Sequence, residues 1–175
     1  MDWLAALVAV SVVVWPALGQ FGESVLGTRY VDGFGTQWWY WYFDEMVAGR
    51  QGLLHTDLLF YPSGKEIFAH TGGNLLDAAL SWPIRRIFPA AAAYNLWIVA
   101  LTASNVLAGS YLGRTTTGLP GWPSGLLLGL NPYVLREIEE GRPTQAWLAL
   151  PALALAGVWS ARRPAALVGT GLAVA

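Results

Sequence analysis

The chain of 175 residues is 55% hydrophobic and only 12% charged, with a mean hydropathy of +0.44. This composition lies outside the usual range of soluble globular domains and predicts a membrane protein. A formal net charge of -1 and the lack of any run rich in lysine and arginine argue against nucleic acid as a partner. Because the sequence has no cysteine, it can form neither disulfides nor metal sites with thiolate ligands.

Four apolar segments and the start of a fifth predict an all-α membrane protein with about four to five transmembrane helices. The first segment, residues 1–18, is apolar apart from Asp2 and Ser11 and is slightly shorter than the roughly 20 residues that cross a bilayer core. A cleaved signal peptide is the alternative interpretation. The residues before Trp3 hold an acid and no lysine or arginine, and the sequence offers a poor cleavage site, so a retained helix is favoured.

The second span, residues 90–113, is the clearest, because it is long enough to cross and carries small and polar residues suited to helix packing. These residues are Asn95, Ser104, Asn105, Gly109, Ser110 and Gly113. Residues 119–130 are short and interrupted by prolines and glycines, which predicts a broken helix or a re-entrant element. Residues 144–161 predict another span and residues 164–175 begin one more, so we expect residues 1–175 to be the N-terminal part of a larger membrane domain.

Arginines in short loops predict the orientation of these spans. Arg114 lies in a short loop without an acid, as do the arginines at 162–163, and such loops tend to stay in the cytoplasm. The N-terminus is then cytoplasmic, and the segments 19–89 and 131–145 lie outside. Those two segments contain every acid of the chain except Asp2, so function is expected on the outer face.

The outer segment 19–89 contains two stretches that predict helices along the membrane surface. Residues 36–48 lie between the helix caps Thr36 and Gly49 and include an unbroken run of aromatic residues at 38–43. Tryptophan and tyrosine favour the headgroup layer, so an aromatic belt is favoured over a sugar-stacking platform for most of these rings. Residues 71–89 repeat the pattern, with a predicted apolar face of Leu75, Leu76, Ala79, Leu80 and Ile84.

Short motifs follow one another in a distinctive order. After the first span come "VDGFGTQWWYWYFDEMVAG", "HTDLLFYPSG" and "FAH"; "YNLW" then opens the next span, and "LNPYVLREIEEGRPTQ" lies near the following membrane boundary. In this order they resemble the N-terminal part of bacterial GT-C superfamily membrane glycosyltransferases, which take sugars from polyprenyl-phosphate carriers. The resemblance implies a location in the bacterial inner membrane. It also implies a polyprenyl-phosphate-sugar donor and a separate acceptor as partners, besides the lipid bilayer.

Asp32 is the first acid candidate for catalysis. Gly33 and Gly35 beside it let the backbone approach a ligand closely. In the enzymes that the chain resembles, the loop after the first span supplies an acid that engages the acceptor, so by resemblance Asp32 is the general base. An acceptor hydroxyl must lose its proton as it attacks the anomeric carbon, and a positioned carboxylate can receive that proton. The alternative is a turn aspartate that caps the residues after it.

Asp57 is the second candidate catalytic acid, because it lies among apolar residues and must find a partner, a cation or a proton. His55 would point to the same face in an extended segment, so an acid and imidazole pair is predicted. Two ligands do not define a metal site, so no bound metal is assigned, although a divalent cation stays open as a cofactor. Asp44 and Glu45 are adjacent on a helix and predict a solvated edge rather than a facing acid and base couple.

Arg136 and Arg142 are the candidates for binding the donor phosphate, since guanidinium groups stabilise a departing phosphate. The alternative is that the glutamates at 137, 139 and 140 pair with them. Arg85 and Arg86, near the bilayer, are as well suited to lipid headgroups. The other candidates for substrate binding, in the motifs given above, are His55, Tyr61, His70 and Gln145.

The leading functional hypothesis is a GT-C-like glycosyltransferase or a fragment of one. The main alternative is a non-catalytic membrane scaffold or assembly subunit with the same architecture and other membrane subunits as partners. A glycoside hydrolase also uses two carboxylates but would not need a membrane. A transporter ranks last, because its spans should carry ionisable groups and these spans contain almost none.

Overall fold

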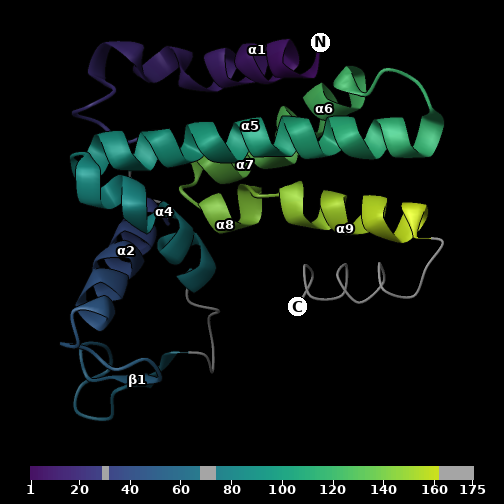
Figure 1. Cartoon of the computed structure of the whole chain (residues 1–175). Helices are drawn as coiled ribbons and strands as arrows, with labels where there is room; N and C mark the ends of the chain where they lie inside the picture. The colour runs from purple at the N-terminus through teal and green to yellow at the C-terminus, as the bar shows by residue number, and fades with distance from the viewer. Residues whose placement is uncertain (29–31, 68–73, 162–175) are drawn as a thin grey trace.

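The computed structural model describes residues 1–28, 32–67 and 74–161, and these residues are mostly helical (Figure 1). The elements in chain order are α1 (Asp2–Val14), the 3-10 helix η1 (Trp15–Gln20), α2 (Gly33–Val47), β1 (His55–Thr56), β2 (Lys65–Glu66), α4 (Leu75–Ile87), α5 (Ala90–Thr117), α6 (Trp122–Gly129), α7 (Pro132–Glu139), α8 (Pro143–Ala146) and α9 (Ala149–Ser160). The two strands pair antiparallel, with His55 opposite Glu66. The predicted fifth span at 164–175 lies outside the described residues.

Two helical stretches in the described part of the chain are long and apolar enough to cross a membrane, namely Asp2–Gln20 and Ala90–Thr117. They coincide with the first and second predicted spans. The second extends one turn past the predicted end at 113, and it ends at Gly118, whose φ of 71° is left-handed. Figure 1 shows α1 lying alongside α5 and running in the opposite direction.

Residues 144–161, predicted as one span, do not form one continuous helix, because the chain breaks between α8 and α9. Pro151 is the physical reason: it has no N–H and cannot continue a helix that begins before Trp147. It fits in the first turn of α9, where backbone N–H groups have no intrahelical partner. With 12 residues, α9 is about 18 Å long, less than a bilayer core. The 8 residues of α6 are shorter still, in agreement with the predicted broken element.

Side chains of α5 hold the chain where it leaves helical structure. Asn95 accepts a hydrogen bond from the backbone N–H of Leu26 at 2.8 Å, and its amide donates to the carbonyls of Phe21 and Ser24, both at 2.8 Å. Asn105 donates to the carbonyl of Ala146 at 2.8 Å, beside the break before α9. The predicted packing against a neighbouring helix is confirmed for Asn105, since Ala146 lies on α8. Asn95 instead binds backbone groups outside the helices, which a buried amide can satisfy.

Helices α5 and α6 meet backbone to backbone. A Cβ added to Gly109 would lie 2.8 Å from Leu128 Cβ and 2.9 Å from the Ser124 carbonyl oxygen. On the facing helix, a Cβ at Gly125 would collide with Ser110 Oγ and with the backbone carbonyl of Val106. Small residues permit such contact between helices, as predicted from the glycines of the second span.

Arg114 has an acidic neighbour, although its own loop contains none. Asp2 at the start of α1 pairs with the Arg114 guanidinium near the end of α5. The sequence interpretation of an uncompensated loop was therefore wrong, because the antiparallel packing of α1 on α5 brings a distant acid to it. The pair places the N-terminus and the loop after α5 at the same end of the molecule.

Helices α2 and α4 run across the direction of α5 rather than along it, and they lie with the β1–β2 hairpin at one end of the molecule (Figure 1). The predicted helix in the aromatic run is confirmed, but it begins at Gly33, before the predicted cap Thr36. Thr36 instead lies buried inside the first turn, where its hydroxyl donates to the carbonyl of Gly141 at 2.6 Å. On α4, Leu76 and Leu80 of the predicted apolar face are exposed.

Candidate functional site

A cavity of about 380 Å³ lies where the start of α2, the N-cap of α4 and helix α8 meet. Three of the residues selected from the sequence line it, namely Asp32, Arg142 and Gln145. The remaining lining residues are Gly35, Thr36, Trp39, Asn74 and Thr144. Segments more than 100 positions apart in the chain therefore form one site.

The backbone between α7 and α8 brings the two sides of the cavity together. Gly141 has a φ of 76°, a left-handed conformation that favours glycine, and an added Cβ would lie 2.6 Å from the backbone nitrogen of Gly33. The Thr36 hydroxyl also joins α2 to this turn, because it donates to the carbonyl of Gly141. Asn74 Nδ2 in turn donates to that hydroxyl at 3.4 Å. These contacts set Arg142 beside the start of α2.

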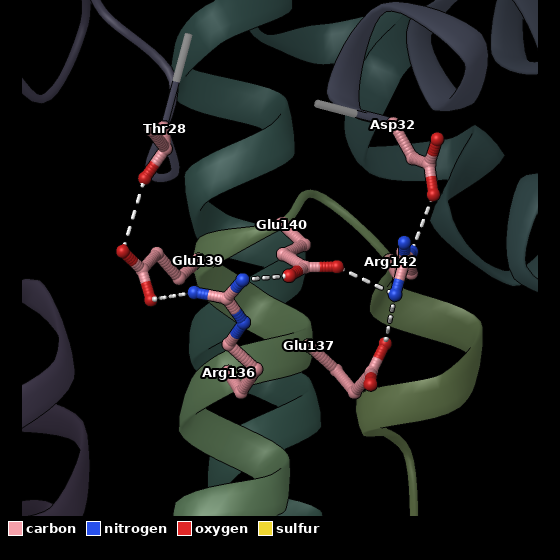
Figure 2. Close-up of polar contacts among 7 residues, drawn as sticks. All are labelled: Thr28, Asp32, Arg136, Glu137, Glu139, Glu140 and Arg142. Atoms are coloured by element: carbon pink, nitrogen blue, oxygen red, sulfur yellow. Dashed lines mark hydrogen bonds and ion pairs between the residues drawn. The ribbon is translucent and has the colours of Figure 1, made fainter. Parts of the chain in front are cut away.

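A network of charged side chains borders the cavity (Figure 2). Arg142 binds the carboxylate of Asp32 through Nε and contacts Glu140 at 2.5 Å and Glu137 at 3.5 Å through Nη1. Hydrogen bonding to Asp32 raises the pKa of Arg142, which stays protonated. The Asp32 side chain is 61% exposed, whereas that of Glu137 is 9% exposed.

Arg136 belongs to the other half of this network (Figure 2). It contacts Glu140, and it lies 3.3 Å from Glu139, which also accepts a hydrogen bond from the Thr28 hydroxyl at 3.2 Å. The predicted alternative, in which the arginines pair with neighbouring glutamates, is therefore what the structure has. Four carboxylates face two guanidinium groups in Figure 2, so a phosphate would have to compete for Arg142.

Asp77 is a buried acid next to the cavity that sequence reasoning did not select. It is 1% exposed and accepts hydrogen bonds from Tyr40 Oη at 2.7 Å, from Trp97 Nε1 and from Thr144 Oγ1 at 3.4 Å. Burial raises the pKa of Asp77 to about 6, and these hydrogen bonds act in the opposite direction. A signal was present, since Asp77, Ser81 and Arg85 recur every fourth residue on one helix face.

The predicted acid and imidazole pair exists, but it lies on the β1–β2 hairpin and lines no part of the cavity. His55 Nε2 lies 2.9 Å from Asp57 Oδ1, and His55 Nδ1 lies 2.8 Å from Glu66 Oε1. Hydrogen bonds to Glu66 and Asp57 raise the pKa of His55. The expected apolar surroundings of Asp57 were wrong, because its side chain is 72% exposed. Tyr61 is also exposed, and His70 lies outside the described residues.

Arg85 is not placed to bind lipid headgroups, because its side chain is only 10% exposed. Its guanidinium donates to Asp44 Oδ1 and to the Tyr40 carbonyl, both at 2.9 Å, and it lies over the Tyr40 ring. Asp44 is therefore part of a contact between α2 and α4, rather than a free solvated edge. Arg86 is exposed and lies over the Trp82 ring, 5.9 Å from its centre.

In residues 1–28, 32–67 and 74–161, no group of three or more histidine, aspartate or glutamate side chains is placed to hold a metal ion. The chain matches no protein-family model, no curated protein and no solved structure.

Proposed function

We propose that the chain forms the substrate cavity of a GT-C-like membrane glycosyltransferase, which transfers a sugar from a polyprenyl-phosphate-linked donor on the extracytoplasmic face. One observation carries this proposal. Asp32 and the pair Arg142 and Gln145, taken from separate motifs of the resemblance, line the same cavity. A carboxylate and a guanidinium in one cavity are the two groups that the transfer requires, one for the acceptor proton and one for the departing phosphate.

The contact between Asp32 and Arg142 gives the two groups a linked role. Arg142 engages Oδ2 of Asp32, so the carboxylate that is to accept the proton is paired before substrates arrive. A donor phosphate that takes over the Arg142 guanidinium releases Asp32 to accept the proton of the acceptor hydroxyl. Glu137 and Glu140 keep Arg142 in place during this exchange, because both still contact its Nη1.

Two apolar stretches and several exposed side chains support the same proposal. The stretch Asp2–Gln20 and helix α5 are long and apolar enough to cross a bilayer, and Leu76, Leu80 and Trp41 are exposed on α4 and α2. We propose that the two stretches cross the membrane and that α2 and α4 lie in its surface, with these three side chains against lipid. The cavity then lies at the interface, where a lipid-linked donor presents its phosphate.

Orientation is tested with single cysteines at Ser63 and Thr116, since the natural chain has none to interfere. We expect an impermeant thiol reagent to label Ser63→Cys but not Thr116→Cys in intact cells, with a cytoplasmic N-terminus. The reverse pattern would invert the proposed topology and place the cavity in the cytoplasm.

The catalytic role is tested by Asp32→Asn in the protein purified in detergent. Because asparagine keeps the shape but cannot accept a proton, we expect sugar transfer to slow by a factor on the order of 100 or more. Donor binding should not weaken, because Arg142 loses a competing carboxylate. Asp44→Asn is the matched control on α2, since its amide oxygen can still accept from Arg85. Thermal unfolding of both variants separates lost catalysis from misfolding.

The second candidate function is a non-catalytic membrane scaffold. It is favoured by the charged network of Figure 2, in which both arginines already pair with carboxylates of the same chain. Equal transfer by wild type and Asp32→Asn would favour this reading, as would a lack of any transfer by a folded wild-type protein.

A further inference from the structure

Asp77 joins the three walls of the cavity. It lies on α4, three residues after the lining residue Asn74, and its carboxylate receives hydrogen bonds from α2, α5 and α8. The donor on α8 is Thr144, which itself lines the cavity. The donor on α2 is Tyr40, next to the lining residue Trp39. A single buried carboxylate thus holds the elements that shape the site.

The three donors are not equivalent. Trp97 Nε1 binds Oδ1, whereas Tyr40 and Thr144 share Oδ2 at 2.7 and 3.4 Å. An indole N–H can only donate, whereas the hydroxyls of Tyr40 and Thr144 can turn and accept, so Oδ2 is the oxygen whose proton finds an acceptor among these three partners. The proton therefore goes to Oδ2, which can then donate to one hydroxyl oxygen. The shorter contact favours Tyr40, so Thr144 keeps the longer bond, which then goes to a neutral carboxyl group instead of a carboxylate.

We infer that Asp77 is a positioning residue of the cavity, which holds the α8 wall through Thr144 and releases it on taking up a proton. The release needs no substrate, so it holds for whatever ligand the cavity takes and is independent of the proposed transfer reaction. Hydrogen bonds to an ionised carboxylate are roughly twice as strong as those between neutral groups, so the longest of the three weakens first.

Among the titratable groups that face one another around Asp77, Asp77 itself is the one that changes charge near pH 6. The titratable or charged side chains facing it are Tyr40 from α2, Tyr94 from α5 and Arg85 from its own helix. Phenols titrate near pH 10 and guanidinium groups above 12, so these neighbours keep one charge state between pH 4 and 8. Burial raises the pKa of Asp77 to about 6, within that range.

The test uses the lack of cysteine in the natural chain. Gln145→Cys on α8 is labelled with bimane, whose fluorescence is quenched at short range by an indole, and Trp39 supplies that indole on the opposite wall. We expect quenching to change between pH 7.5 and pH 5 with a midpoint near pH 6, as the α8 wall is released. Trp39→Phe in the labelled protein should abolish the quenching and so identify its source.

Two variants separate positioning from a merely structural role. Asp77→Asn resembles the protonated state, so we expect the quenching to stay at its low-pH level throughout. Thr144→Val keeps Tyr40 and Trp97 on Asp77 and removes only the link to the cavity, so it should also abolish the pH transition. Glu45→Gln, an acid on α2 that pairs with Arg50 outside the cavity, should leave the transition intact. An unchanged transition in either Asp77→Asn or Thr144→Val would overturn the inference.

Discussion

Two places in the molecule depend on glycine for close contact between backbones, and they differ in what surrounds the contact. Between α5 and α6, Gly125 lies against Val106 and Ser110, and the neighbouring atoms belong to small or apolar residues. Between α2 and the segment before α8, Gly141 lies against Gly33, and the neighbouring side chains include Asp32 and Arg142. Close packing of side chains and backbone holds the α5–α6 contact, whereas ion pairs and hydrogen bonds hold the contact between Gly141 and Gly33.

This difference explains why the cavity lies at the second contact. Packed apolar atoms have no partners to exchange, so a ligand gains nothing by approaching the α5–α6 contact. An exposed ion pair such as Asp32 with Arg142 can exchange one partner for a ligand group at small cost, because water already screens it. The first region is therefore expected to respond to added volume, and the second to changes of charge.

The largest effect is expected for Gly125→Val at the α5–α6 contact. The new side chain would collide with the backbone of α5, so we expect a loss of at least about 3 kcal/mol in stability, with little folded protein recovered. Gly125→Ala should be a milder form of the same defect. The measurement is thermal unfolding in detergent, and the matched control is Gly22→Ala, where an added Cβ would meet nothing within 4 Å. Equal stability of the Gly125 and Gly22 variants would show that this contact does not limit folding.

The second effect concerns the buried acid beside the cavity, and it depends on pH. The pKa of Asp77 is about 6 in the folded protein and about 3.9 in an unfolded chain, so the folded state binds the proton more tightly. The stability from this proton is full below about pH 4 and is lost as pH rises through 6, a change of about 3 kcal/mol.

Asp77→Asn cannot titrate, so the comparison with wild type isolates this contribution from those of the other acids. We expect the variant to match wild type near pH 4.5 and to be more stable at pH 7.5, as measured by thermal unfolding at both pH values. A constant difference between the two proteins across this range would mean that Asp77 keeps one charge state.

The sequence predicted these regions unevenly, for physical reasons. Helix periodicity and hydropathy located α1, α2, α4 and α5, because each has a pattern that no tertiary contact overrides. They failed at Pro151, since hydropathy counts apolar residues and ignores a missing N–H. They also gave no sign that Arg114 would meet Asp2, because that pair depends on how two helices pack.

For the site, the motifs and the charge pattern selected Asp32, Arg142 and Gln145, whose meeting in one cavity requires the turn at Gly141. Asp77 was missed because the apolar residues around it dominated the pattern. The leucines of α4 led to the interpretation of a surface helix. The polar face of the same helix, which packs against α2 and α5, was not recognised from the sequence.

The smallest effect is expected at the outer edge of the charged network. Arg136 is 62% exposed and pairs with glutamates on its own helix, so Arg136→Gln should change stability by within about 0.5 kcal/mol. Arg142→Gln should instead alter the cavity, because Arg142 joins Asp32 on α2 to Glu137 and Glu140 on the other side. The measurement is the bimane quenching at Gln145→Cys together with thermal unfolding, each at low and high salt. We expect Arg136→Gln to leave the quenching unchanged and Arg142→Gln to alter it. The difference in quenching between wild type and Arg142→Gln should shrink at high salt, because salt screens the exposed pair of Asp32 and Arg142 in the wild type. A change of quenching in Arg136→Gln as large as that in Arg142→Gln would mean that the charged network acts as one unit.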